Sequence, residues 1–242
     1  MTIAVVAGIC FVATLVRSTF GFGESLVAVP LLALVIPIEV AVPLAVLLSV
    51  LVAVVTVIQD RASIHFSSAK WLVAFALPGI PIGLAILVYV EDYWVRIGLG
   101  VLIILYSAYA ALAKRKAHLD EDHKGWLFVC GLLSGVLGGA YGINGPPLVV
   151  YGNLRRWSPQ HFRATLQAYF LPASAIGLIG YAVKGLLGAT VMTDFALCLP
   201  ATIPAVFLGR YLNSKLDGPA FFKYVYCGLI LIGVSLIAFT LT

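Results

Sequence analysis

The sequence predicts an all-α polytopic membrane protein made of two inverted repeats, and three observations point to this class. The 242-residue chain is 62% hydrophobic and only 10% charged, whereas soluble domains carry about 25% charged residues. Several apolar runs are long enough to cross a bilayer as helices. Two glycine-rich segments interrupt the other apolar stretches at matching places, in GFGESLVAV (21–29) and GINGPPLVV (142–150).

Run lengths justify the individual elements. A membrane-crossing helix needs about 20 apolar residues. The runs that reach this length are 40–58, 71–90, 94–113, 164–183, 186–209 and 220–240. The runs 3–16 and 146–151 are shorter, since a helix over 3–16 would rise only about 21 Å. Each half is therefore expected to begin with a short-helix hairpin broken at its glycines, which three transmembrane helices follow.

The longest charged run divides the chain. It predicts a first transmembrane repeat over 1–113, a charged cytoplasmic linker over 114–124 and a second repeat over 125–242. Later in each half, PGIPIG (78–83) matches PAVFLG (204–209). Such self-similarity is the signature of a repeated structural unit.

Basic residues predict the orientation of the repeats, because loops rich in Lys and Arg stay in the cytoplasm. EDYW at 91–94 then faces outside, as do both termini, with Lys184 as an exception. These assignments agree only if the halves have opposite orientations and each broken pair enters and leaves on one side. The residues assigned to the cytoplasm are Arg61, Lys70, the 114–124 run, Arg155, Arg156, Arg163, Arg210 and Lys215.

The broken segments predict an anion site. Irregular backbone survives at membrane depth only inside protein or beside a water-filled cavity. Breaks in corresponding positions of two halves indicate a transporter site near the midplane, where the first amides of a helix receive an anion. Alternatively, the glycines only permit close helix packing. The candidate residues are Gly21, Gly23, Glu24 and Ser25 in the first segment and Gly142, Asn144 and Gly145 in the second.

Four polar residues near the breaks extend this site. Arg17 follows the first apolar run, and a charge there calls for a partner, either an anionic substrate or Glu24; alternatively it reaches an interface from a crossing helix. Glu24 is a proton carrier or, alternatively, caps its helix or pairs with Arg17. Thr165 and Gln167 either hydrogen-bond a substrate oxygen or join helices.

The sequence gives no sign of a disulfide, a metal site or a catalytic motif. The four cysteines lie inside apolar runs without a CxxC pair, so neither a disulfide nor a metal site is expected. No histidine pair has the HExxH spacing, and neither a GxSxG nor a Walker motif occurs. We therefore expect no enzyme activity, cofactor or nucleic-acid partner.

The chain resembles the sulfite exporter TauE/SafE family of membrane permeases along most of its length. The resemblance rests on GFGESLVAVPLL (21–32), its second copy GLLSGVLGGAYGINGPPLVV (131–150), RATLQAY (163–169) and the P-x4-G repeats. It implies movement of sulfite, sulfonates or related anions across the bacterial inner membrane. The first copy departs from the family's run of glycines at Phe22 and Glu24.

Together, these features predict a secondary transporter that exports a small sulfur-containing anion, sulfite or an organosulfonate, by alternating access. The anion would bind at the broken-helix N-termini. The expected partners are this anion and the lipid bilayer, and a homo-oligomer is left open. The alternatives are a carrier or channel for another solute or for a cation attracted by Glu24, an intramembrane enzyme, and a receptor without transport.

Overall fold

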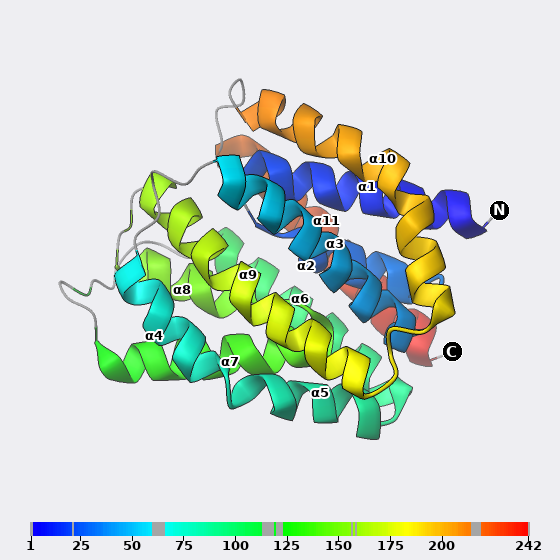
Figure 1. Ribbon diagram of the computed structural model, residues 1–242, viewed down its shortest axis with the longest axis horizontal. Helices are drawn as coiled ribbons and strands as arrows, with labels where there is room; N and C mark the ends of the chain where they lie inside the picture. The colour runs from blue at the N-terminus through cyan, green and yellow to red at the C-terminus, as the bar shows by residue number, and fades with distance from the viewer. Residues whose placement is uncertain are drawn as a thin grey trace.

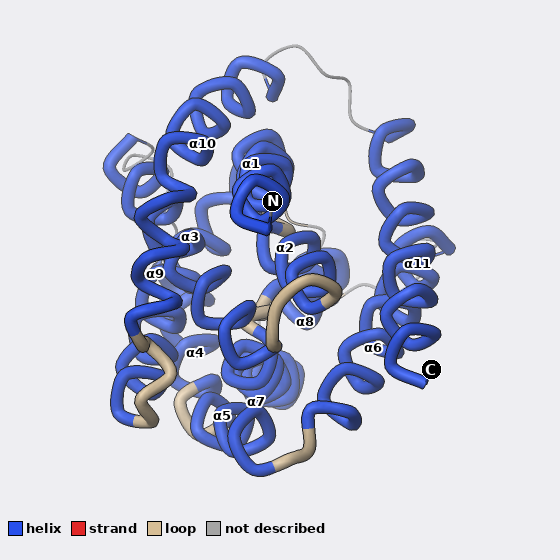
Figure 2. Tube along the Cα trace, turned by 90° about the vertical axis from the view of Figure 1, so that its right-hand side faces the viewer, coloured by secondary structure: helices blue, strands red, loops and turns tan. Residues whose placement is uncertain are grey.

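The computed structural model describes residues 2–20, 22–59, 66–112, 119, 123–155, 157, 159–213 and 219–241. Within these ranges the chain forms α-helices and no strand, as Figures 1 and 2 show. The helices are α1 (Thr2–Phe20), α2 (Glu24–Ala33), α3 (Ile38–Gln59), α4 (Phe66–Ala76), α5 (Gly79–Tyr89), α6 (Asp92–Leu112), α7 (Lys124–Tyr141), α8 (Gly145–Leu154), α9 (Pro159–Val183), α10 (Ala189–Asn213) and α11 (Pro219–Leu241).

The apolar helices confirm an all-helical polytopic membrane protein. Among the described residues, α3, α6, α7 and α10 are each long and apolar enough to cross a membrane, and α4 with α5 adds one bent span. The helices α9 and α11 contribute the apolar stretches Ala168–Val183 and Leu229–Leu241. Each long predicted run therefore coincides, to within a few residues at its ends, with one described helix or, over 71–90, with two.

One predicted span is bent. The run 71–90 forms α4 and α5, whose axes differ by 43°. Pro78 and Pro81 both lie at this bend, and a proline lacks the N–H that would continue the helix and clashes with the preceding turn. In the second half, α10 continues through Pro200 and Pro204, so the two halves differ here.

The first helix is longer than its apolar run. The sequence predicts a short piece over 3–16, but α1 continues through Arg17 to Phe20, giving 19 residues and a rise of about 28 Å. The polar last turn is accommodated because Arg17 and Thr19 are buried by neighbouring helices. Arg17 consequently lies in the helix that leads into the first break.

The helices pack in reciprocal pairs. α1 packs along α10, and α7 packs along α4 and α5. α3 packs on α9, and α6 packs on α11. In chain order, α1 corresponds to α7, α3 to α9, α4 and α5 together to α10, and α6 to α11. With this correspondence, the α1–α10 pairing matches the pairing of α7 with α4 and α5, and the α3–α9 and α6–α11 pairings each match themselves.

The glycines of the two P-x4-G motifs make corresponding contacts. A Cβ added to Gly83 would lie 2.7 Å from the nitrogen of Ala140 and 2.9 Å from the Cα of Gly139, both on α7. A Cβ added to Gly209 would lie 2.6 Å from the Cβ of Ser18 and 3.1 Å from the nitrogen of Thr19, both on α1. In the register that pairs the broken segments, Ser18 and Thr19 correspond to Gly139 and Ala140.

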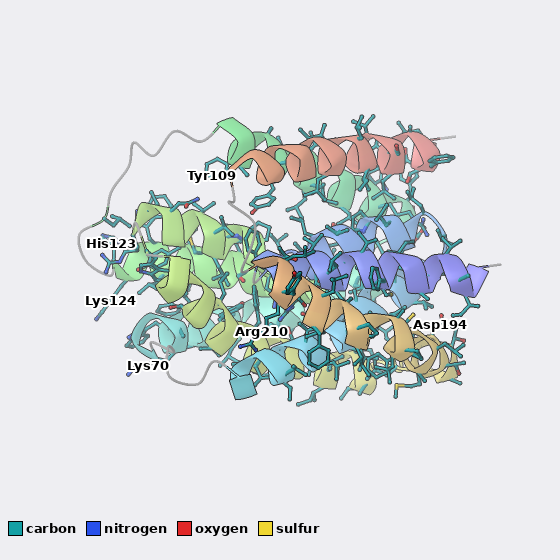
Figure 3. The ribbon with its side chains drawn as sticks, turned by 90° about the horizontal axis from the view of Figure 1, so that it is seen from above. Lys70, Tyr109, His123, Lys124, Asp194 and Arg210 are labelled. Atoms are coloured by element: carbon teal, nitrogen blue, oxygen red, sulfur yellow. The ribbon has the colours of Figure 1, made fainter. Side chains whose placement is uncertain are left out.

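The short helices that follow the breaks lie inside the bundle. In Figure 2, α2 and α8 lie within an outline formed by α3, α9 and α10 on one side and α6 and α11 on the other. Nearly every residue of α2 is buried. The two chain ends lie at the same end of the molecule, where α1 begins, whereas α7 begins near Lys124 at the opposite end (Figures 1 and 3).

Candidate functional site

Both glycine-rich segments break the helical backbone, as predicted. Gly23 has φ 95° and directly precedes α2, and Gly142 has φ 65° and directly follows α7. A positive φ is accessible to glycine at no steric cost. The chain therefore reverses at each glycine-rich segment, and a new helix begins at Glu24 and at Gly145.

Close packing adds a second reason for glycine at 142. A Cβ there would lie 2.6 Å from Cγ2 of Val46 on α3. The end of α7 is closed by backbone hydrogen bonds from the Gly142 amide to the Gly138 carbonyl (2.9 Å) and from the Ile143 amide to the Leu137 carbonyl (3.2 Å). This second break is thus a defined turn that lies against α3.

Polar side chains fix the start of α8. The Ser134 hydroxyl donates to the Asn144 carbonyl at 2.6 Å. The Asn144 side chain lies against Gly138, where an added Cβ would be 2.8 Å from Oδ1. Pro146 and Pro147 occupy the first turn of α8 and have no N–H, so Gly145 is the first-turn residue of α8 that keeps its amide donor.

The start of α2 keeps more amide donors. The bond that closes its first turn runs from the Val27 amide to the Gly23 carbonyl at 3.1 Å. The amides of Glu24, Ser25 and Leu26 precede this bond, so the helix itself supplies them with no acceptor. The positive end of the α2 dipole therefore lies at the first break.

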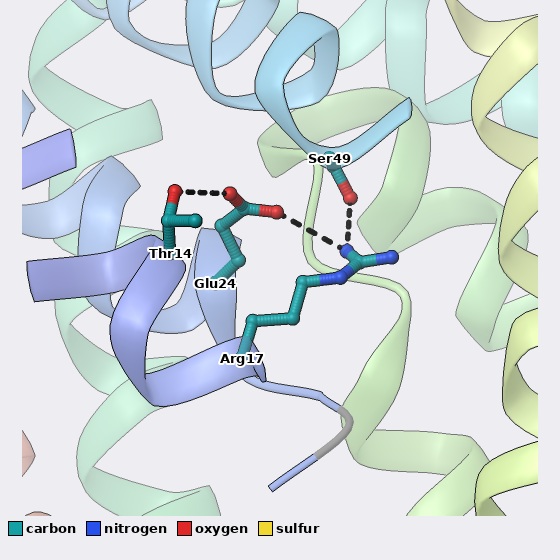
Figure 4. A network of polar contacts seen from close by, with 4 residues as sticks. All are labelled: Thr14, Arg17, Glu24 and Ser49. Carbon is teal, nitrogen blue, oxygen red and sulfur yellow. Dashed lines mark hydrogen bonds and ion pairs between the residues drawn. The ribbon is translucent and has the colours of Figure 1, made fainter. Parts of the chain in front are cut away.

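A buried ion pair joins the two helices of the first hairpin. Arg17 Nη1 lies 3.3 Å from Glu24 Oε2, and the Thr14 hydroxyl donates to Glu24 Oε1 at 2.9 Å. Arg17 Nη1 also donates to the hydroxyl of Ser49 on α3. Figure 4 shows the guanidinium between the carboxylate and this hydroxyl. Arg17 is 3% exposed and Glu24 is 1% exposed, so both charges are removed from bulk solvent.

The guanidinium also faces an aromatic ring. Cζ of Arg17 lies 5.3 Å from the centroid of the Phe170 ring on α9, within the range of a cation–π contact. Arg17 of α1 is thereby held by groups from α2, α3 and α9. This position between the helices, rather than at an outer interface, favours a functional charge over a snorkelling one.

One cavity is lined by both breaks. It encloses an empty volume of about 380 Å³, part of which is open to the surroundings. Seven of the ten candidate residues line it, which are Arg17, Gly23, Glu24, Ser25, Gly142, Asn144 and Gly145. The remaining lining residues are Phe22, Leu26, Ser49, Tyr106, Ile143, Pro146, Phe170 and Ser174.

Three candidates are not placed at this cavity. Thr165 is fully buried in α9 but does not line it. Gly21 and the side chain of Gln167 lie outside the described part of the chain. From α9 the lining residues are instead Phe170 and Ser174, which are four residues apart and so share a helix face. That spacing was readable in the sequence, but nothing there indicated which face meets the breaks.

The lining has two kinds of surface. The guanidinium, the helix-start amides and the hydroxyls of Ser25, Ser49 and Ser174 can donate to oxygen atoms. Phe22 and Phe170 supply apolar surface on either side of Gly145, each with a ring atom 4.0 Å from where a Cβ would lie. The lining therefore offers hydrogen-bond donors that suit an oxyanion and apolar surface that suits a small hydrophobic group.

Comparison with known proteins bears on this site. A probable sulfite/organosulfonate exporter TauE of Cupriavidus necator is 29% identical over 164 residues, which are 66% of this chain and 63% of that protein. The match thus spans less than two thirds of the relative's length. No solved structure matches the chain. The sequence profile of the sulfite exporter TauE/SafE family matches residues 6–236, and the chain therefore belongs to this family.

Proposed function

We propose that the protein is a secondary transporter that exports a small sulfur-containing anion, sulfite or an organosulfonate, across the bacterial inner membrane. The observation that carries the proposal is the single cavity lined by Arg17, by the start of α2 and by the second break. Buried cations and helix starts are the groups that bind oxyanions in proteins. Membership of a family named for sulfite export supports the substrate class.

The anion would lie against Arg17 and the start of α2. Its oxygens would accept hydrogen bonds from the guanidinium, from the α2 amides and from Ser49 or Ser25. The apolar surface of Phe22 and Phe170 favours an organosulfonate, because an alkyl group gains by leaving water. We assign transport rather than catalysis, and alternating access would expose the cavity to each side in turn.

Thermal stabilisation of the purified protein tests the substrate. Sulfite and ethanesulfonate are expected to raise the melting temperature, with the tighter ligand giving the larger shift at equal concentration. A ligand present at 100 times its Kd adds about 2.7 kcal/mol to stability. Export is then checked by loss of labelled sulfonate from proteoliposomes. Stabilisation by a cation alone, abolished in Glu24→Gln, would reject the anion assignment in favour of a cation carrier.

We also propose that the two halves form inverted repeats. The reciprocal helix pairings, the corresponding glycine contacts and the opposite starting ends of α1 and α7 support this arrangement. In each half the hairpin would enter and leave on one side, and the two hairpins would enter from opposite sides.

Cysteine labelling tests the inverted arrangement. Ile3, Val35 and Asn153 are exposed and lie near the start of α1, the end of α2 and the end of α8. In a background without the native cysteines, an impermeant maleimide added to intact cells should label Ile3→Cys and Val35→Cys but not Asn153→Cys. Labelling of positions 35 and 153 from the same side would contradict opposite entry.

A further inference from the structure

The described lining of the cavity carries no net charge before any anion arrives. Arg17 and Glu24 carry opposite charges, both are almost fully buried, and both line the cavity. The other described side chains that interact with Glu24 are Thr14 and Cys10 of α1, and the cavity lining from α3 and α6 consists of Ser49 and Tyr106. The described side chains of α11, from Leu229 to Leu241, include no titratable group.

An added anion would therefore give the described lining and its ligand a net negative charge. Charges inside a membrane protein are costly unless they are compensated. The anion would also compete directly with Glu24, since the same Arg17 Nη1 faces Glu24 Oε2 at 3.3 Å. That separation is longer than the 2.7–2.9 Å typical of a strong charge-assisted bond, so the pair leaves room for a better acceptor.

We propose that each anion binds together with one proton, which is held by Glu24. This inference rests on the proposed anion site. The anion takes the place of the carboxylate at the guanidinium, and Glu24 takes up a proton from a hydronium ion of the surrounding solution to become a neutral carboxylic acid. One O–H bond forms on the carboxyl group and one breaks in the hydronium ion. With a singly charged anion, the net charge of the Arg17, Glu24 and anion group therefore stays at zero.

The surroundings of Glu24 suit both states of the carboxyl group. The Thr14 hydroxyl donates to Oε1 in the ionised form, and a hydroxyl can equally accept from a protonated carboxyl. Among the described residues, no group of three or more His, Cys, Asp or Glu side chains could hold a metal ion instead. A proton needs no ligand beyond the carboxylate oxygen that it binds.

Binding of ethanesulfonate to the purified full-length chain between pH 5.5 and 7.5 tests the inference. This ligand keeps its single negative charge over the whole range, so any pH dependence belongs to the protein. The Kd of the unmodified protein should rise by up to tenfold per pH unit at the upper end of the range, because one proton is linked to each anion. Binding in weakly buffered solution should take up one proton per ethanesulfonate, as reported by an indicator dye.

Two variants locate the proton. Glu24→Gln imitates the protonated carboxyl, so its Kd should change less than twofold over the range and should lie below that of the unmodified protein at pH 7.5. Glu39→Gln, at the start of α3 and outside the cavity lining, should retain the full pH dependence. If Glu24→Gln fails to fold, proton uptake by the unmodified protein still decides.

The outcomes are distinguishable. Anion binding that is independent of pH and takes up no proton would overturn the proton assignment and leave the anion site standing. Binding that is lost when sodium is replaced by choline would assign the compensating charge to sodium and overturn the proton. No binding of any sulfur anion by either protein at any pH would overturn the proposed function and this inference with it.

Discussion

Replacing Arg17 by alanine is expected to abolish anion-dependent stabilisation and to destabilise the protein. The substitution removes the cation of the cavity and leaves Glu24 buried without its partner. Removing one member of a buried ion pair costs about 3–5 kcal/mol, because the group left behind must either stay charged in a low-dielectric environment or take up a proton. Thermal unfolding with and without sulfite and ethanesulfonate measures both effects on the same sample.

A second substitution separates binding from stability. Glu24→Gln in the Arg17→Ala background removes the orphaned charge, so part of the lost stability should return while anion binding stays absent. Recovery of anion-dependent stabilisation in this double variant would contradict a role for Arg17 in the site. Full stability of Arg17→Ala alone would show that the ion pair is not buried as described.

Alanine at Gly209 is expected to weaken the contact between α1 and α10. Its Cβ would lie 2.6 Å from Ser18 Cβ and 2.8 Å from the Leu15 carbonyl oxygen, so the two helices must move apart. Overpacking that displaces backbone costs about 1–3 kcal/mol. Anion affinity should also fall, since Ser18 is adjacent to Arg17 and α1 carries both. Unfolding and binding measurements on the purified variant check the two effects.

Two other glycines serve as comparisons for this prediction, one in a close contact and one in open space. Gly83→Ala should cost a similar amount, because its Cβ would meet the backbone of α7 at 2.7 Å. Gly177 in α9 has open space around it, so Gly177→Ala should leave stability unchanged or raise it by about 0.5–1 kcal/mol, as alanine favours helix over glycine. Equal losses of stability in Gly209→Ala and Gly177→Ala would show that close packing at Gly209 is not the cause of the destabilisation.

Most of the helical architecture could be predicted from the sequence. Apolar runs of membrane length have no alternative to a helix in lipid, so α3, α6, α9, α10 and α11 were expected close to their observed bounds. The breaks were also expected, because glycine and proline interrupt a regular helix whatever lies around them. The bend between α4 and α5 was missed, since prolines bend one helix here and leave α10 continuous.

Part of the candidate site could also be predicted from the sequence. The glycine segments named most of the cavity-lining residues, and Arg17 was identified because a charge beside an apolar run demands a partner. Phe170 and Ser174 were not identified, whereas Thr165 was identified but does not line the cavity. Thr165 and Phe170 are five residues apart and so lie on different faces of α9, and periodicity alone does not reveal which face meets another segment.

The sequence by itself thus determined that this chain spans a membrane, where its helices break and which charge stands beside the first break. These are local consequences of hydrophobicity, of the missing N–H of proline and of the conformational freedom of glycine. Only the tertiary structure decided that the two breaks line one cavity and that Arg17 pairs with Glu24 rather than reaching an interface. Those facts depend on how helices far apart in the chain pack, because a side chain's partner is set by packing geometry.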